Sequence, residues 1–305
     1  MKVLWVAGPT EIEADVISDC ATAGIDCEIV DVYEIDVCTL PARIRTAAAD
    51  ITVLRHPFYL ATDRDVRAEV QALDMPILAW SSEQGTTKND GECLLGGFRN
   101  KAVNNAHDAK AGGYLYMPFG CAYRGRVEYN RKINDVLVDS MRPHYACRDC
   151  AGDVKAKSVE TMVLPLIGFS MSFYGEWGGR HGWSAVPDAV QHYQGTFPPS
   201  MLCEICEQHR VYVGISWNWQ SAGYGCKLAR AMATGIPVVW HRTPHMALDG
   251  LIEGENILCS SSPAETRERV LEAMAKPEIG YEGRQFALEN WRWSKLLTRM
   301  VNELR

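Results

Sequence analysis

Short apolar runs alternate with segments of helical periodicity along the first 120 residues. The apolar runs predict strands at residues 2–8, 27–32, 50–56, 76–81, 102–107 and 113–120. Between them, apolar positions recur every three to four residues in segments 11–24, 40–49 and 63–74, which predicts helices. Strands that alternate with helices of about ten residues are typical of a parallel sheet, so we expect a doubly wound α/β domain here.

The same alternation resumes after a looser stretch. Residues 125–141 are predicted to form one helix, and residues 142–157 have no clear period. Strands are then predicted at 170–177, 211–216, 236–241 and 256–260, and helices at 183–193, 226–235, 263–275 and 283–304. We therefore predict an α/β fold with two Rossmann-like domains facing a cleft. The domains are 1–160 and 161–290, with a boundary near 155–166, and a C-terminal helix at 291–305 packs back toward the first domain.

A glycine loop followed by a lysine carries the clearest chemical signal. In "SAGYGCKLARAMATGIPVVW", residues 221–240, Gly223 and Gly225 lie between a predicted strand and a predicted helix. Ligands of such sheets bind beyond the C-terminal strand ends, where bare amides and a helix N-terminus favour an anion. Lys227 in the first turn opposes the helix dipole unless an anion is bound. The loop is predicted to hold a diphosphate; a plain glycine turn with a solvated lysine is the alternative.

Several segments resemble glycosyltransferases of the GT-B class. "GYGCKLARAMATGIPVV" is similar to the donor-domain segment of glycosyl transferases group 1, and "MSFYGEWGGR", "GLIEGENILCSSSPAET" and "ALENWRWSKLLTRMVNEL" resemble its flanks. In the first half, "GYLYMPFG" resembles the segment before the interdomain region. A basic residue at the position of Lys227 is typical of the CgeB-like (spore-maturation) branch. The resemblance implies an N-terminal acceptor domain and a C-terminal domain that binds a nucleotide-diphosphate sugar. The implied donor-binding residues are Gly175, Arg180, Ser216, Gly223, Gly225, Lys227 and Arg230.

One departure from the family pattern concerns the ribose contact. Many transferases of this class carry two glutamates eight positions apart, where this chain has Ala222 and Arg230. Arginine cannot accept hydrogen bonds from ribose hydroxyls, so Arg230 is expected to bind phosphate or to pair with an acid. We still expect a nucleotide-diphosphate sugar, with a UDP-sugar as the first candidate.

The departing diphosphate needs either a metal ion or fixed cations. No DxD-type triplet is placed to hold a divalent ion, and "DRD" at 63–65 is at a helix start, where acids act as caps. We therefore expect a metal-independent enzyme without a cofactor, in which Arg180 and Lys227 stabilise the leaving group. Candidate bases for the acceptor hydroxyl are His56, Glu83 and His107, which follow predicted strands. A retaining enzyme would need no separate base.

The acceptor is less well defined by the sequence. Thr10 either contacts it or caps the first helix in a capping box with Glu13, and the cap is favoured. Residues 99–157 hold 11 basic and 6 acidic side chains, including Arg99 and Arg124, so an anionic acceptor is one reading and a solvated surface is the other. A hydroxymethylated base in DNA, flipped out of the duplex, is one candidate acceptor.

Composition bounds the remaining possibilities. The chain has 305 residues, a net charge of −7 and 11 cysteines, with neither a signal peptide pattern nor a membrane-spanning run, so we expect a cytoplasmic protein. The pairs Cys147–Cys150 and Cys203–Cys206 could supply four zinc ligands, but their separation is unlike that of a zinc ribbon. Because "MLCEICEQH" has a helical pattern, Cys203 and Cys206 are expected to be packed thiols. The aromatic segment "WNWQ" at 217–220 either stacks on a ligand or packs inside the protein.

Three other functions use the same or a similar fold. A sugar-nucleotide epimerase would share the diphosphate site but would bind no acceptor. A catalytically inactive relative would bind the nucleotide without consuming the sugar. A dehydrogenase is disfavoured, because "VAGPTEIEA" after the first predicted strand lacks the G-x-G-x-x-G pattern.

Overall fold

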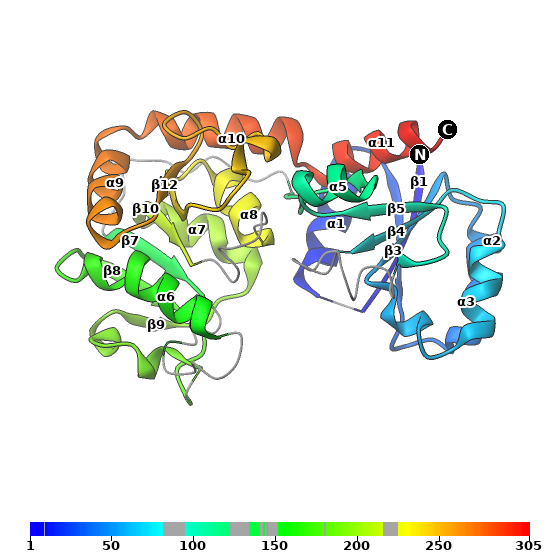
Figure 1. Cartoon of the computed structure of the whole chain (residues 1–305), viewed down its shortest axis with the longest axis horizontal. Helices are drawn as coiled ribbons and strands as arrows, with labels where there is room; N and C mark the ends of the chain where they lie inside the picture. The colour runs from blue at the N-terminus through cyan, green and yellow to red at the C-terminus, as the bar shows by residue number, and fades with distance from the viewer. Residues whose placement is uncertain are drawn as a thin grey trace. The chain divides into compact units, whose positions relative to one another are not determined.

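A computed structural model shows the chain as two α/β units (Figure 1). It describes residues 1–8, 10–81, 95–122, 134–140, 143, 145, 152–179, 181–215 and 225–305. Unit 1 comprises residues 1–123 and 289–305, and unit 2 comprises residues 124–288. No helix within the described residues is both long and apolar enough to span a bilayer.

Unit 1 is built around a parallel six-stranded sheet with the order β2-β1-β3-β4-β5-β6. Its strands are β1 (Lys2–Ala7), β2 (Asp26–Asp31), β3 (Ile51–Arg55), β4 (Ile77–Ser81), β5 (Asn100–Val103) and β6 (Leu115–Tyr116). Its helices are α1 (Glu11–Thr22), α2 (Leu40–Ala47), α3 (Arg64–Gln71), α5 (Ala106–Gly112) and α11 (Trp293–Leu304). The chain reverses its direction across the sheet between β1 and β3, and ligands of doubly wound sheets bind at such a switch point.

The last helix belongs to unit 1 because it completes the core of that unit. Trp293 of α11 makes edge-to-face contacts with Trp5 of β1 and Trp80 of β4, at centroid distances of 5.4 and 5.8 Å. Asp19 of α1 is fully buried and accepts hydrogen bonds from Arg292 Nε and Ser294 N, both at 2.9 Å. A buried carboxylate needs such partners, so this contact fixes the start of α11 against α1.

Unit 2 has a second parallel six-stranded sheet, with the order β12-β11-β10-β7-β8-β9. Its strands are β7 (Asn134–Asp139), β8 (Met171–Tyr174), β9 (Tyr193–Gly195), β10 (His209–Gly214), β11 (Val238–His241) and β12 (Leu258–Ser260). Its helices are α6 (Gly152–Met162), α7 (Leu202–Glu207), α8 (Cys226–Thr234), α9 (Pro263–Ala275) and α10 (Glu278–Asn290). Counted from β7, this is the 3-2-1-4-5-6 order of the Rossmann fold, and its switch point lies between β7 and β10.

Strand β7 differs from the expected helix at 125–141, whose described part is this strand. Val136 and Val138 are fully buried in the core of unit 2. The polar residues on both sides of this short apolar run hide its strand character in the sequence. Because β7 pairs with β8 and β10, unit 2 starts before the expected boundary at residue 160, which lies inside α6. The expected helix at 183–193 is instead two short 3-10 turns, at Trp183–Ala185 and Ala189–Gln191.

Candidate functional site

An ion pair lies at the switch point of unit 2. Lys227, in the first turn of α8, donates a hydrogen bond from Nζ to Asp139 Oδ1 at the end of β7, at 2.6 Å. Helix α8 follows β10, so the pair connects the two strands between which the chain reverses direction. The side chain of Lys227 is 33% exposed, and its ammonium has more than one N–H to donate. It is therefore available to an anion while Asp139 fixes its position.

The N-terminus of α8 has no side-chain cap. Gly225 is the N-cap residue, with φ −75° and ψ 173°, and provides no side-chain hydrogen bond to the first amides. A Cβ added at Gly225 would meet no described residue within 4 Å. The amides of a first helical turn need outside partners, and an anion satisfies both them and the helix dipole. Gly235, with φ 86°, ends the helix in a left-handed conformation.

Gly175 has a structural requirement that the resemblance alone does not reveal. It follows β8 with φ 145°, and an added Cβ would overlap the carbonyl oxygen of Ser140. Its amide donates to Gly195 O at 2.8 Å, and its carbonyl accepts from the Tyr193 hydroxyl at 2.9 Å. These backbone groups are therefore engaged within unit 2. Gly175 therefore lets the end of β8 approach the end of β7 closely.

Arg230 is buried inside unit 2 with 2% of its surface exposed. Burial raises the pKa of the Tyr212 phenol well above 10, and the Asp139 carboxylate raises it further while Arg230 lowers it. The charge of Arg230 therefore lies inside unit 2, where it acts on the buried Tyr212 phenol with a sign opposite to that of Asp139.

His241 ends strand β11 at the same edge of the sheet. Only 2% of its surface is exposed, and burial lowers its pKa to about 4. The imidazole is therefore neutral at pH 7.

The corresponding edge of unit 1 carries a hydrogen-bonded cluster around Thr10. The expected capping box of α1 is confirmed: the Thr10 hydroxyl accepts from Ile12 N, and the Glu13 carboxylate accepts from Thr10 N at 2.8 Å. Arg55, the last residue of β3, donates from Nη1 to Thr10 Oγ1 at 2.9 Å and to Glu13 Oε1 at 2.7 Å. Glu13 Oε1 also accepts from Trp5 Nε1 at 3.0 Å.

Two of the expected bases lie in unit 1, one directly after a strand and one in a helix. His56 follows β3 directly and has φ 48°, a left-handed conformation that is strained for a residue with a side chain. Its backbone amide donates to Trp80 O at 2.8 Å. His107, in the first turn of α5, lies 3.3 Å from Asp108 Oδ1 through its Nδ1 and is 45% exposed. Strain of this kind is common at functional positions, which favours His56 over His107 as the base.

Several expected site residues lie outside the described residues, namely Glu83, Arg124, Arg180, Ser216 and Gly223, together with "WNWQ" at 217–220 and the Cys147–Cys150 pair. In α7, Cys206 is buried and Cys203 is partly buried, as expected for packed thiols. Arg99 Nη1 lies 3.8 Å from Asp74 Oδ1, and both side chains are largely exposed.

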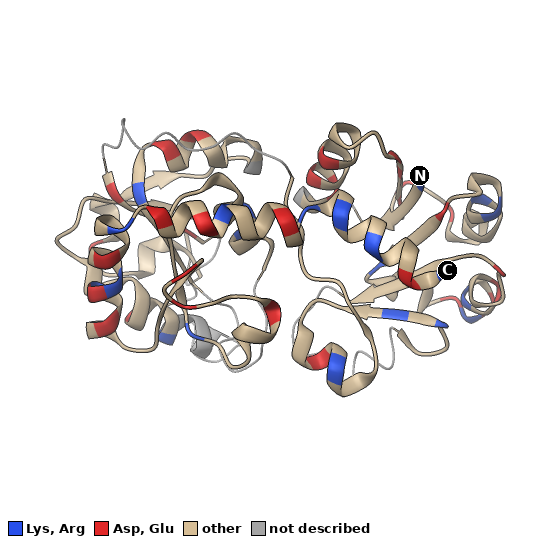
Figure 2. Ribbon diagram, turned by 90° about the horizontal axis from the view of Figure 1, so that it is seen from above, with Lys and Arg blue, Asp and Glu red and all other residues tan. Residues whose placement is uncertain are grey.

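The basic segment 99–157 is divided between the two units. Arg99, Lys101 and Lys110 belong to unit 1, whereas Lys157 belongs to unit 2. Figure 2 shows mainly acidic residues along α10, and basic residues followed by an acidic one along α11. Within the described part of the chain, no group of three His, Cys, Asp or Glu residues is placed to hold a metal ion.

Sequence reasoning missed Asp139 and Arg55. The expected helix at 125–141 places Asp139 in its last turn, which hides its position at a strand end. At the end of β3, His56 and not Arg55 was the expected site residue. A signal was present for Arg55, because a charged residue at the end of an apolar parallel strand lies where ligands bind.

Comparison with solved structures identifies the fold. The chain matches a sucrose-phosphate synthase from Thermosynechococcus elongatus with a TM-score of 0.67 and 11% identity, covering 99% of this chain and 98% of that chain. A lipopolysaccharide outer core galactosyltransferase matches with a TM-score of 0.55 and 11% identity, covering 99% of both chains. A pneumococcal O-GlcNAc transferase in complex with UDP and GlcNAc matches with a TM-score of 0.53 and 15% identity, covering 87% of this chain and 59% of that chain. The fold is therefore the GT-B fold.

A family match narrows the activity. Residues 157–302 match the family described as glycosyl transferase-like, a segment that includes α8 and Lys227 but not Asp139. A search among curated proteins finds no match. The chain therefore has the GT-B fold, and its segment 157–302 is similar to glycosyl transferase-like proteins.

Proposed function

We propose that the protein transfers a sugar from a nucleoside-diphosphate sugar to a hydroxyl group of an acceptor, without a divalent metal ion. The observation that carries the proposal is the Lys227–Asp139 pair at the switch point of unit 2, beside the N-terminus of α8. In this arrangement the diphosphate accepts hydrogen bonds from Lys227 Nζ and from amides of the first turn of α8. UDP is the preferred nucleotide, because a structural neighbour was solved with UDP.

Bond cleavage places extra negative charge on the departing diphosphate. A cation held in place beforehand stabilises that charge without having to reorganise. Lys227 meets this condition because Asp139 holds its ammonium at the end of β7. An ammonium between a carboxylate and a diphosphate performs the charge neutralisation that a divalent ion performs in other transferases. This is the physical basis for a metal-independent reaction, to which Arg180 would add a second cation.

Unit 1 is proposed to bind the acceptor. His56 is the first candidate for the base that takes the proton from the acceptor hydroxyl, on account of its position after β3 and its backbone conformation. His107 and Glu83 are the alternatives. A retaining enzyme would transfer the sugar without such a base, and substitution of His56 would then leave its turnover unchanged.

A nucleotide screen tests the proposal. The melting temperature is measured with UDP, GDP, CDP, dTDP and their sugars, with and without EDTA. We expect stabilisation by one nucleotide family that EDTA does not reduce. Sugar consumption is then followed by chromatography. Conversion of the donor alone into a new sugar nucleotide would indicate an epimerase instead of a transferase. A folded protein that none of these nucleotides stabilises would contradict the proposed donor site.

A further inference from the structure

Three neighbouring strands of unit 1 end in one row. Ala7 of β1 pairs with Asp31 of β2, and Val6 pairs with Leu54, which places Ala7 opposite Arg55 of β3. The residues that follow this row therefore project beyond the same edge of the sheet, at the switch point of unit 1.

Arg55 has unused hydrogen-bonding capacity at this edge. Its side chain is 13% exposed, and its hydrogen bonds to described residues both start from Nη1. No described residue accepts a hydrogen bond from its buried Nε. The carboxylate of Glu13 is already occupied by Trp5, Thr10 and Arg55 Nη1, so it cannot serve the rest of the guanidinium. Guanidinium groups with open N–H positions bind phosphates and carboxylates.

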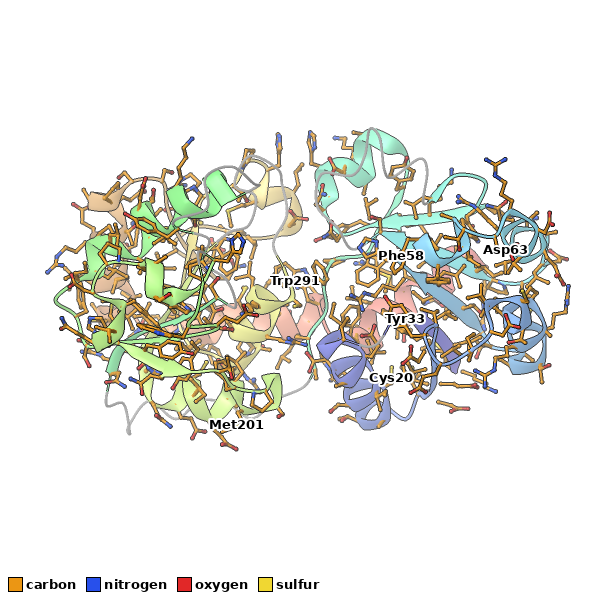
Figure 3. All side chains as sticks on the ribbon, turned by 90° about the horizontal axis from the view of Figure 1, so that it is seen from below. Cys20, Tyr33, Phe58, Asp63, Met201 and Trp291 are labelled. Carbon is orange, nitrogen blue, oxygen red and sulfur yellow. The ribbon has the colours of Figure 1, made fainter. Side chains whose placement is uncertain are left out.

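Two exposed aromatic rings follow the same row of strand ends. Tyr33, two residues after β2, is 70% exposed, and Phe58, three residues after β3, is 46% exposed; both are labelled in Figure 3. They are the exposed aromatic residues of unit 1 among those described, whereas its tryptophans are buried.

The backbone of Gly8 explains the position of Tyr33. A Cβ at Gly8 would lie 2.6 Å from Tyr33 Cε2, so the missing side chain lets the ring lie across the end of β1. Asp31 Oδ1 accepts a hydrogen bond from Tyr33 N at 2.8 Å and fixes the turn. The tyrosine ring is thus held at the strand ends although most of its surface is open to solvent.

We propose that this edge is an acceptor subsite for a small sugar that carries one phosphate or carboxylate group. The oxyanion binds to Arg55, and the sugar ring packs on Tyr33 and Phe58. Polar anchors beside apolar ring contacts are the usual composition of small-ligand sites. The inference rests on the proposed transferase function, for which it names the acceptor class.

The charge around the subsite favours a small acceptor over a nucleic acid. Residues 1–98 hold 7 basic and 17 acidic side chains, and Glu13, Asp31 and Glu34 lie near the edge in question. Nucleic-acid binding depends on several cations that neutralise successive phosphates. One arginine can bind a single oxyanion, whereas the acidic residues around it repel a polyanion.

Calorimetry with matched sugars tests the proposal. The probes are glucose 6-phosphate, glucuronate and glucose, titrated into the full-length wild type, Arg55→Gln and Tyr33→Ala. Arg45→Gln is the control, because Arg45 is an exposed arginine of unit 1 that pairs with Glu69 at 2.8 Å. We expect one charged sugar to bind the wild type at least about tenfold more tightly than glucose does. Arg55→Gln is expected to remove this preference, Tyr33→Ala to weaken all three sugars, and Arg45→Gln to change nothing.

The outcomes separate this subsite from the donor site. UDP is titrated into the same samples, and Arg55→Gln is expected to leave its affinity unchanged. Equal binding of charged sugars to wild type and Arg55→Gln, or no binding to a wild type that binds UDP, would overturn the subsite. Arg55-dependent binding of a charged sugar without UDP binding would overturn the donor site instead. Tighter, Arg55-dependent binding of a short DNA duplex would replace the sugar with a nucleic acid. If Arg55→Gln does not fold, Arg55→Lys keeps the charge but loses the planar fork, and intermediate affinity is expected.

Discussion

Lys227 Nζ and Asp139 Oδ1 lie 2.6 Å apart, although 88 positions separate the two residues in the sequence. The pair links the first turn of α8 to the end of β7 across the switch point of unit 2 (Figure 1). In the absence of nucleotide, the carboxylate neutralises the ammonium. A bound diphosphate would share Lys227 with Asp139, and its charge would be repelled by that carboxylate.

The affinity for UDP is therefore expected to rise when Asp139 loses its charge. Asp139→Asn keeps an oxygen that accepts from Lys227 but removes the repulsion on the diphosphate. We expect UDP to bind about threefold to tenfold more tightly, equivalent to about 1 kcal/mol. Calorimetric dissociation constants of the wild type and the variant measure the effect. Weaker binding by Asp139→Asn would mean that the carboxylate acts chiefly by orienting Lys227.

Gly175 is expected to be required for folding rather than for ligand contact. Gly175→Ala forces an alanine into φ 145° and against the Ser140 carbonyl, so we expect unit 2 to lose at least about 2 kcal/mol of unfolding free energy. Gly178→Ala is the matched control in the same loop, because an added Cβ there meets nothing within 4 Å. Urea unfolding of both variants checks the prediction. Equal stability of the two would contradict the close approach of β7 and β8.

The buried pair between Asp19 and Arg292 is expected to hold the C-terminal helix on unit 1. Arg292→Met removes the ion-pair partner of a fully buried carboxylate, at a cost of about 3–5 kcal/mol. Arg305→Met breaks an exposed pair with Asp50 and should have a much smaller effect, because solvent screens exposed charges. Denaturant unfolding compares the two. A loss for Arg305→Met as large as that for Arg292→Met would refute the distinction by burial.

His241 is expected to make unit 2 less stable in mild acid. Its pKa is about 4 in the folded protein and 6.5 in the unfolded chain, so the unfolded state binds more protons between these values. The contribution of neutral His241 to the free energy of unfolding is fully present above pH 6.5 and is lost as the pH falls toward 4. It totals on the order of 3 kcal/mol. His241→Gln should show a flatter decline of unfolding free energy over this window, measured by urea titration at several pH values. Parallel pH profiles of the wild type and His241→Gln would contradict the assignment of this acid sensitivity to His241.

The fold class followed from the sequence because its evidence is local. Alternating apolar runs and helical segments identify most strands without knowledge of their partners, as in β1 and β10. Strand β7 was not predicted, because its apolar core, Val136 to Val138, is short and is flanked by polar residues. Without this strand, the domain boundary was expected at residue 160 rather than at the start of unit 2.

The candidate site could be predicted only where the signal lies within one loop. Gly225 and Lys227 are close in sequence, and a glycine followed by a basic first helical turn predicts an anion site because helix N-termini bind anions. The partners of Lys227 and Arg55 were not predictable, because pairing of β7 with β10 and of β1 with β3 brings distant residues together. Likewise, the burial of Arg230 depends on how α8 packs on β10 and not on its spacing from the loop.

Titration of UDP into the wild type, Lys227→Met and Lys276→Met tests the central claim most directly. Lys276 is an exposed lysine of unit 2 that pairs with Glu272 at 2.9 Å, so its variant controls for loss of one positive charge. We predict that Lys227→Met weakens UDP binding about 10-fold to 100-fold, as expected for a lost charge-assisted hydrogen bond, whereas Lys276→Met has no effect. Equal affinity of a folded Lys227→Met protein and the wild type would contradict a donor diphosphate held by Lys227.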